Sequence, residues 1–386
     1  MRSGVVLLLL LASCYQPTVQ TGLPCSESGA CPAGQTCDRG RCMAMPLDDD
    51  ASGVDSALTD APPSDAVDGA IDAPMIDAQV VPLAWTETTP LPSARSFLCV
   101  AAFGNRVYAT GGSVNMVSKV DVLMSSIQPN GTLGGWAAMT ALPVANRWHG
   151  CAVDTANPSL YIVGGDAGTT ARAEVYRATI NVANGSLGPW LSQAPLPAAR
   201  RGAGVVWTAG TLYVLGGEEA DGFQLRDSVY RATTTSTGIP GGWTTQSALL
   251  PADYSFGTAA AGGRIFKTGG YTGDETVRMS SIGAGGALNS FTVTTALPGP
   301  RQRHFSVTDG TFVYAVGGEI TFSGMNLDTA YRATVGTTGL GAWTLLPTMP
   351  LSIAYGDGAL VNGRIYMVGG SDGTSPTARV FILSGL

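Results

Sequence analysis

An aromatic residue three positions before a pair of adjacent glycines occurs six times in the second part of this 386-residue chain. Successive pairs are 53, 52, 53, 48 and 52 residues apart. So regular a period indicates one structural unit repeated six times. The glycine pairs are Gly111-Gly112, Gly164-Gly165, Gly216-Gly217, Gly269-Gly270, Gly317-Gly318 and Gly369-Gly370, and the aromatics are Tyr108, Tyr161, Tyr213, Phe266, Tyr314 and Tyr366.

Two further markers keep the same register. A second aromatic precedes each glycine pair, and a Leu-Pro or Met-Pro follows that aromatic. Three markers that keep nearly the same spacing over six units strongly indicate an internal repeat. The second aromatics are Trp85, Trp136, Trp190, Trp243, Phe291 and Trp343, and the prolines are Pro92, Pro143, Pro197, Pro251, Pro298 and Pro350.

The repeat resembles the kelch repeat, whose units of roughly 50 residues each form one four-stranded blade of a β-propeller. Glycine suits the end of the second strand because it lets a bulky ring lie over the backbone and can adopt positive φ. Plentiful Val, Thr, Tyr and Trp, punctuated by 52 glycines and 23 prolines, also favour an all-β protein. The sequence therefore predicts an all-β, six-bladed kelch-type β-propeller over residues 85–386, with four antiparallel strands per blade.

The tetrapeptide YRAT at 176–179, 230–233 and 331–334 fits the third strand of a blade. The other copies have drifted to LMSSI at 123–127, RMSSI at 278–282 and VFILS at 380–384. Arg177, Arg231 and Arg332 are expected to be structural residues of outer strands, salt-linked or solvated.

The ring is expected to close through both ends of the repeat region. The chain ends in a third strand with no Trp strand after it, and the region begins with a lone Trp strand in AWTETTPLP at 84–92. The first strand can complete the last blade, which leaves no open sheet edge.

The N-terminus predicts export and lipid anchoring. Residues 1–13 read as a signal peptide with a short apolar segment after Arg2, and LASC at 11–14 resembles the lipobox of bacterial lipoproteins. The resemblance implies that Cys14 carries the lipid, that residues 14–24 form a spacer, and that the protein is an outer-membrane lipoprotein of the bacterial cell envelope, periplasmic or surface-exposed. An ordinary cleaved signal peptide is the alternative.

Two short segments separate this anchor from the repeats. Residues 25–42 hold Cys25, Cys31, Cys37 and Cys42, which predict two disulfides in a mini-module; three pairings are open, and zinc binding is disfavoured because no CxxC pair or nearby His is present. Residues 43–84 form an acidic, Pro-containing linker expected to be disordered. A tether is its simplest role, and binding of calcium or a basic partner is the alternative.

Charge excludes some partners. The net charge of −7 comes from the linker, because residues 85–386 hold 18 basic and 17 acidic residues. The sequence has no stripe of basic residues that would indicate nucleic-acid binding. The protein is expected to contact the membrane only through its lipid anchor. No motif calls for a cofactor or a metal.

Ligand-binding candidates follow the prolines, where the innermost strands begin and converge on a central channel. Arginine forks bind carboxylates well, so a protein or glycan ligand at this rim is expected. The alternative is that the arginines cap strand ends and bond neighbouring blades. The candidates are Arg95, Arg147, Arg200, Arg301, His304, Tyr254 and Tyr355.

The sequence favours a non-catalytic binding module and leaves catalysis open. A carbohydrate-processing enzyme, such as a sialic-acid mutarotase or a lyase, and a purely structural envelope module are the alternatives. The inner-strand stretches contain few carboxylates, chiefly Asp253 and Asp357. Cys99 and Cys151 look like matching positions of blades one and two, too far apart to pair, and are expected to be buried thiols.

Overall fold

The computed structural model describes residues 35–38, 41–44, 82–168, 170–219, 224–272, 275–320 and 323–386. The chain divides into two compact units, Met1–Met75 and Ile76–Leu386. In the first unit, β1 (Gln35–Asp38) and β2 (Arg41–Ala44) form an antiparallel hairpin. The predicted signal peptide, Cys14, Cys25, Cys31 and almost all of the acidic linker lie outside the described residues, as do the side chains of Cys37 and Cys42. No helix long and apolar enough to cross a bilayer occurs in the part of the chain that the structure describes.

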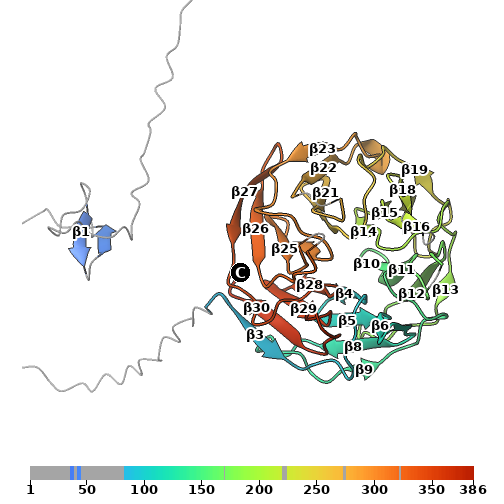
Figure 1. Ribbon diagram of the computed structural model, residues 1–386, viewed down its shortest axis with the longest axis horizontal. Helices are drawn as coiled ribbons and strands as arrows, with labels where there is room; N and C mark the ends of the chain where they lie inside the picture. Colours follow the sequence, from blue (N-terminus) through green and yellow to red (C-terminus); the bar gives the residue numbers. More distant parts are fainter. Residues whose placement is uncertain are drawn as a thin grey trace, which may run out of the picture. The chain divides into compact units, whose positions relative to one another are not determined.

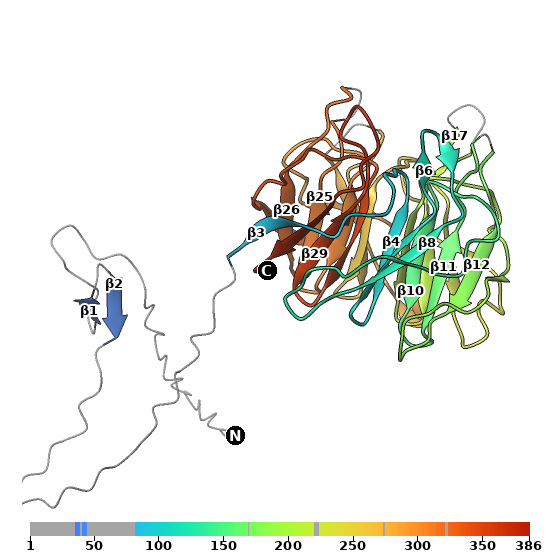
Figure 2. The same ribbon diagram turned by 90° about the horizontal axis from the view of Figure 1, so that it is seen from below.

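The second unit is a ring of six four-stranded antiparallel sheets, as predicted (Figure 1). Each sheet runs from an innermost strand at the channel to an outermost strand at the rim, and Figure 2 shows the ring from the side. From the innermost to the outermost strand, blade one consists of β4 (Cys99–Phe103), β5 (Arg106–Thr110), β8 (Val122–Ser126) and β9 (Ala137–Ala138), blade two of β10 (Gly150–Asp154), β11 (Ser159–Val163), β12 (Val175–Thr179) and β13 (Leu191–Ser192), and blade three of β14 (Gly204–Thr208), β15 (Thr211–Leu215), β18 (Val229–Thr233) and β19 (Thr244–Thr245). Blade four consists of β20 (Gly257–Ala261), β21 (Arg264–Thr268), β22 (Val277–Ser281) and β23 (Thr292–Thr294), and blade five of β24 (Phe305–Thr308), β25 (Phe312–Val316), β26 (Ala330–Val335) and β27 (Leu340–Leu345). Blade six consists of β28 (Asp357–Val361), β29 (Arg364–Val368), β30 (Val380–Ser384) and β3 (Ala84–Thr88).

Two small hairpins extend from the glycine-pair ends of blades one and three. They are β6 (Ser113–Val114) with β7 (Val117–Ser118), and β16 (Glu218–Glu219) with β17 (Gln224–Leu225).

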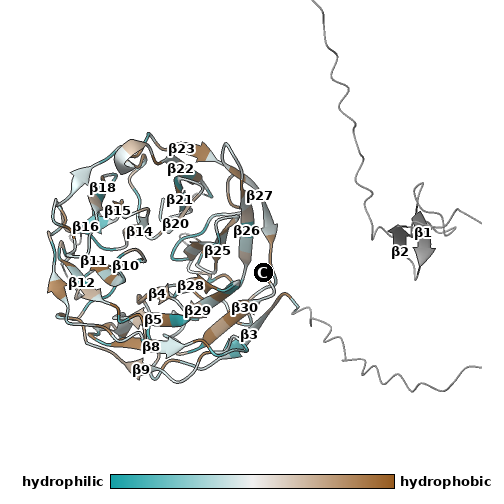
Figure 3. Cartoon of the chain, turned by 180° about the vertical axis from the view of Figure 1, so that it is seen from behind, coloured by the Kyte–Doolittle hydropathy of each residue, from teal (hydrophilic) through white to brown (hydrophobic). Residues whose placement is uncertain are grey.

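The apolar core is divided among the interfaces between blades. Six clusters of buried residues each combine side chains from two neighbouring blades, and Figure 3 shows apolar residues along the blade strands. The second strands contribute most: every residue of β11 and β15 is buried. Since each blade covers its neighbour, no blade has a complete core of its own, which is why the repeat must close into a ring.

Closure uses strands from both ends of the repeat region, as predicted. β3 pairs antiparallel with β30 over five residue pairs, from Ala84 opposite Ser384 to Thr88 opposite Val380. Trp85 of β3 is buried and donates its indole N–H to the carbonyl of Pro347 in blade five. The first described strand of the propeller therefore completes the last blade and bonds it to its neighbour.

The marker aromatics join adjacent blades by hydrogen bonds. Trp136, Trp190, Trp243 and Trp343 donate their indole N–H groups to carbonyls of the preceding blade at 2.8 to 3.1 Å. The hydroxyls of Tyr108, Tyr213 and Tyr366 donate to carbonyls of the following blade's outer turn: Gly185, Gly286 and Gly131, respectively. The YRAT arginines Arg177 and Arg231 bond the next blade's outer turn in the same way, so they are structural but not salt-linked.

A closed ring of six backbone hydrogen bonds joins the starts of the innermost strands. One residue per blade donates its N–H to the carbonyl of the equivalent residue in the preceding blade, at 2.7 to 3.1 Å. All six residues have φ between 52 and 59°, a left-handed conformation that only glycine adopts without cost. We call these residues the collar: Phe97, Trp148, Gly202, Ser255, Arg303 and Tyr355.

Deleting residues 85–92 removes most of β3 and is expected to destabilise the propeller by several kcal/mol, because the edge of β30 and the apolar surface under Trp85 become exposed. Thermal and urea unfolding of the full chain and of the deletion variant measure the effect. Deleting residues 25–42, in the other compact unit, is the control and should leave propeller unfolding unchanged. Equal stability of the 85–92 deletion and the parent would show that closure does not depend on this strand.

Ser255 allows a test of the collar, because its hydroxyl has no hydrogen-bond partner and its φ is 58°. Ser255→Val should lower the free energy of unfolding by about 2 kcal/mol, since a β-branched residue is strained at this φ. Ser255→Gly should be nearly neutral, as Gly202 already occupies the equivalent position. Urea denaturation distinguishes the pair, and similar stabilities for the two variants would mean that the collar geometry stores no strain.

Candidate functional site

The innermost strands surround a cavity of about 550 Å³ on the ring axis. It runs from the collar along the first strand of every blade, and small residues such as Ala, Gly and Cys form much of its wall. A cavity of this size suits a small molecule of up to drug size. The channel is therefore the candidate functional site.

Aromatic and cationic side chains gather on one arc of the collar. The rings of Tyr355 and Phe97 lie 4.5 Å apart, and those of Phe97 and Trp148 lie 4.8 Å apart, both edge to face. Guanidinium groups cover the two ends of this arc: Arg303 lies 4.6 Å from the ring centre of Tyr355, and Arg201 lies 4.8 Å from that of Trp148. The opposite arc has only the small collar residues Gly202 and Ser255, and the buried ring of Tyr254 lies against Gly202 and edge to face with Trp148 at 6.3 Å.

Carboxylates neutralise the guanidinium groups near the collar. Asp166 is fully buried and accepts hydrogen bonds from Arg147 and Arg201, both at 2.8 Å. Arg201 also pairs with Glu218, and Arg303 pairs with Glu319. Each acid directly follows a glycine pair. The collar therefore presents bound donors and acceptors and no excess of positive charge.

The predicted rim of ligand-facing arginines is wrong for Arg95, Arg200 and Arg301. Each is at most 3% exposed and donates to the carbonyl of the first glycine of its own blade's pair, namely Gly111, Gly216 and Gly317. Asn146 makes the same bond to Gly164 in blade two. The physical reason is their position: they lie two residues before the collar, where side chains point into the blade. Arg147, one residue before the collar, is 5% exposed and bonded to Asp166.

The other three candidates differ in their surroundings. Tyr355 belongs to the collar and lines the channel, and burial raises its pKa to about 12. Tyr254 is buried beside the collar and does not line the channel. His304 lines the channel but is buried, and desolvation holds its pKa well below the usual value.

Both histidines play the same part at two interfaces. Nε2 of His149 lies 2.8 Å from Oγ1 of Thr110, and Nε2 of His304 lies 2.9 Å from Oγ1 of Thr268, each in the preceding blade. Thr110 donates its own hydroxyl hydrogen to the carbonyl of Cys99, so Nε2 of His149 carries the hydrogen of the first bond. Burial lowers the pKa of His149 to about 4, so this histidine is neutral at physiological pH.

Cys99 and Cys151 form a disulfide, contrary to the prediction of two thiols. Their Cα atoms are 5.9 Å apart. The two positions are not equivalent: Cys99 matches Gly150 and lies two residues after the collar, whereas Cys151 lies three residues after it. Because strand side chains alternate between faces, a one-residue offset turns Cys99 toward blade two and Cys151 toward blade one.

Equivalent contacts occur at every blade interface. The residue two positions after the collar meets the residue three positions after the collar in the next blade, and in four of six cases one partner is glycine. These four are Gly150 with Val205, Gly204 with Thr258, Gly257 with Ser306, and Phe305 with Gly358. The other two are the Cys99–Cys151 disulfide and Asp357, whose carboxylate accepts the N–H of Val100 at 2.7 Å.

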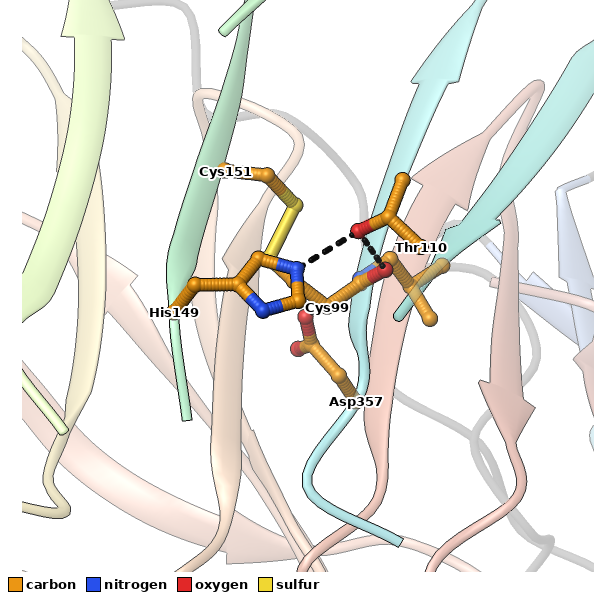
Figure 4. Close-up of a disulfide and its surroundings, with 6 residues drawn as sticks. Cys99, Thr110, His149, Cys151 and Asp357 are labelled. Carbon is orange, nitrogen blue, oxygen red and sulfur yellow. Dashed lines mark hydrogen bonds between the residues drawn. A yellow bond between two sulfur atoms is a disulfide. The ribbon is translucent and has the colours of Figure 1, made fainter. Parts of the chain in front are cut away.

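Asp357 is an unusual carboxyl group in the channel wall. Burial raises its pKa to about 7, against the opposing effect of hydrogen bonds from the backbone N–H groups of Val100 and Gly358. One of its oxygens and the two disulfide sulfurs all lie within 4.8 Å of one another. Figure 4 shows the carboxyl group pointing toward the disulfide. The carboxyl therefore keeps its proton to a higher pH than an exposed aspartic acid does.

Counting from the proline marker could have revealed these relations. Phe97, Trp148, Gly202, Arg303 and Tyr355 each stand five residues after their proline, whereas Arg95, Arg200 and Arg301 stand three after theirs. The same count places Cys99 at seven and Cys151 at eight. The four candidate arginines thus belong to two structural positions, and the collar residues share no residue type by which to recognise them.

Comparison with known proteins supports the kelch resemblance. No protein-family model matches the chain. The Kelch-like protein terF of Aspergillus terreus (strain NIH 2624 / FGSC A1156) is 26% identical over 198 residues, which cover 48% of this chain and 40% of the relative. The chain thus matches well under two thirds of that protein's length.

A solved structure shares the architecture. The structure of YjhT superposes with a TM-score of 0.62 at 14% sequence identity, covering 77% of this chain and 97% of that one. At this identity the likeness concerns the fold. The second unit of the chain is thus a six-bladed β-propeller, and its repeated Gly-Gly, Tyr and Trp markers together with the similarity to the Kelch-like protein support a propeller of the kelch-repeat type.

Proposed function

We propose that the propeller is a non-catalytic binding module that takes a carbohydrate ligand at the collar end of its channel. The aromatic arc carries this proposal, because sugar rings stack on aromatic faces through their C–H groups. Phe97, Trp148 and Tyr355 are half-buried, and all three line the channel.

Paired charges at the collar favour an uncharged polyhydroxyl ligand over an anion. The guanidinium groups of Arg147, Arg201 and Arg303 are each bound to a carboxylate, so an anionic ligand would have to compete with Asp166, Glu218 and Glu319. The carboxylates of these pairs are buried, whereas the side chains of Arg201 and Arg303 stay 14% and 18% exposed, and their N–H groups suit sugar hydroxyls. A protein ligand could offer only a narrow loop to a cavity of about 550 Å³.

Trp148→Ala and Tyr355→Ala should each weaken binding of a glycan identified on an array by about tenfold, since an aromatic contact contributes roughly 0.5–1.5 kcal/mol. Calorimetry on the full chain measures the affinity. Phe291→Ala, on the outermost part of blade four, is the matched control and should bind like the parent. Affinity should change little with ionic strength, because the charges are internally balanced.

Three outcomes would overturn the proposal. Binding that both collar variants leave unchanged would place the ligand elsewhere. A steep loss of affinity with salt would indicate an anionic ligand. Conversion of the bound sugar would mean that the protein is an enzyme.

We further propose that the protein is a lipoprotein of the bacterial envelope, anchored through Cys14. The motif LASC at 11–14 supports this proposal. Cys14→Ser should move the protein from the membrane fraction to the soluble fraction, because acyl chains supply the anchoring energy at roughly 0.8 kcal/mol per buried methylene. Fractionation of cells expressing each form measures this, with Cys25→Ser as the control. Continued sedimentation of Cys14→Ser with membranes would contradict lipid anchoring.

A further inference from the structure

Because the six blades repeat one structure, comparing the six blade interfaces shows which contacts every interface needs. At four of six interfaces, the contact just past the collar is made by glycine against a larger residue, with no covalent bond and no charge. The two exceptions are the Cys99–Cys151 disulfide and Asp357. Closing the ring therefore requires neither a disulfide nor a carboxyl group at this level.

The two exceptions lie next to each other. Cys99 belongs to blade one, which contacts blade two through the disulfide and blade six through Asp357. As a result, both sulfurs and a carboxyl oxygen lie within 4.8 Å of one another at one side of the channel (Figure 4). A buried carboxyl group is costly without a charged partner, and glycine occupies the same position in blades two, three and four. Its presence beside the disulfide calls for a chemical explanation.

We propose that the Cys99–Cys151 disulfide is a site of thiol–disulfide exchange with a low-molecular-weight thiol in the channel, and that Asp357 donates the proton to the departing cysteine. Both cysteines line the cavity, and they are 7% and 9% exposed. A small thiol can enter a cavity of about 550 Å³, whereas a protein surface cannot reach its wall.

The exchange takes place in two balanced steps. The thiolate of the small molecule attacks one sulfur, the sulfur–sulfur bond breaks, and a mixed disulfide forms at the attacked cysteine. The bonding electron pair leaves on the other cysteine, which takes the proton of Asp357. A second thiolate attacks the small-molecule sulfur of the mixed disulfide, and the small-molecule disulfide leaves. The released cysteine thiolate and Asp357 then take up from water the two protons that the two small thiols lost on ionisation. Two thiols have then been oxidised, and Cys99 and Cys151 have each become a thiol.

Other groups along the channel do not titrate near neutral pH. The remaining ionisable side chains in its lining are His149, His304, Arg303 and Tyr355. The pKa of His149 is lowered to about 4, that of His304 is well below its usual value, and that of Tyr355 is raised to about 12. Arg303 is paired with Glu319. Since the pKa of Asp357 is raised to about 7, its carboxyl carries the proton below that pH and loses it above.

The test measures reduction of this one disulfide in the folded full chain by glutathione. After acid quenching and alkylation, mass spectrometry of the peptides that contain Cys99 and Cys151 gives the rate without interference from the other cysteines. The rate should rise linearly with glutathione. The reduction rate divided by the concentration of glutathione thiolate should fall as the pH rises through about 7, because Asp357 then loses the proton that it donates.

Asp357→Asn keeps an oxygen that can accept the Val100 N–H but cannot supply a proton. This variant should be slower by about tenfold or more at pH below 7 and should lose the pH dependence, because general acid catalysis is removed. Asp372→Asn, in an exposed turn of the same blade, is the matched control and should react like the parent. Circular dichroism verifies that both variants are folded.

A second measurement does not depend on Asp357. In Cys151→Ser, the free Cys99 should react with iodoacetamide in the folded protein but not with a maleimide carrying a long polymer. A reduction rate independent of glutathione concentration would mean that the disulfide opens only on unfolding and is a structural cross-link. Equal rates for Asp357→Asn and the parent, or no reaction of Cys99 with iodoacetamide, would likewise overturn the proposal.

Discussion

Six backbone hydrogen bonds between the starts of the innermost strands set the geometry of the channel. Each collar residue donates to its neighbour in the preceding blade, so every strand begins at a fixed distance from the next. The geometry requires positive φ at all six positions, five of which are not glycine. This conformation is costly for residues with a Cβ atom, and the packing of whole blades must hold it in place. The collar therefore depends on the closed ring, and the ring in turn fixes which side chains reach the channel.

Closure is distributed over three levels of each interface. At the channel, the collar bonds and the small-residue contacts hold neighbouring strands together. Farther out, apolar clusters fill the space between second strands, and tyrosine hydroxyls bond to the next blade's turn. At the rim, tryptophan N–H groups bond to the preceding blade, and only Phe291 lacks such a donor. Because all three levels repeat around the ring, the loss of one bond leaves many equivalents, whereas the loss of β3 opens an entire edge.

The sequence predicted the fold but only part of the site. Gly-Gly, Tyr, Trp and Pro markers identify strands because nearly the same residue types recur at nearly the same spacing in all six units. The lone Trp strand at 84–92 likewise predicted closure, since an unpaired strand and an incomplete blade require each other. The collar depends instead on contacts between blades, and its six residues differ in type. Arg95 and Arg147 were predicted to share one role at the rim, but they stand three and four residues after their prolines. This difference of one position buries Arg95 in its blade and pairs Arg147 with Asp166.

The same one-residue precision explains why the cysteines were misassigned, and it shows how an internal repeat separates structure from chemistry. A feature that recurs at one position in several blades is explained by the fold: the Arg–glycine carbonyl bond occurs in three blades, and the His–Thr bond in two. His149 lies beside the disulfide, but His304 makes the same bond where no disulfide exists, so its bond to Thr110 requires only a structural explanation. Cys99, Cys151 and Asp357 have no counterpart at the other four interfaces. Symmetry-breaking residues that cluster at one side of a shared channel are therefore the part of this propeller that its fold does not account for.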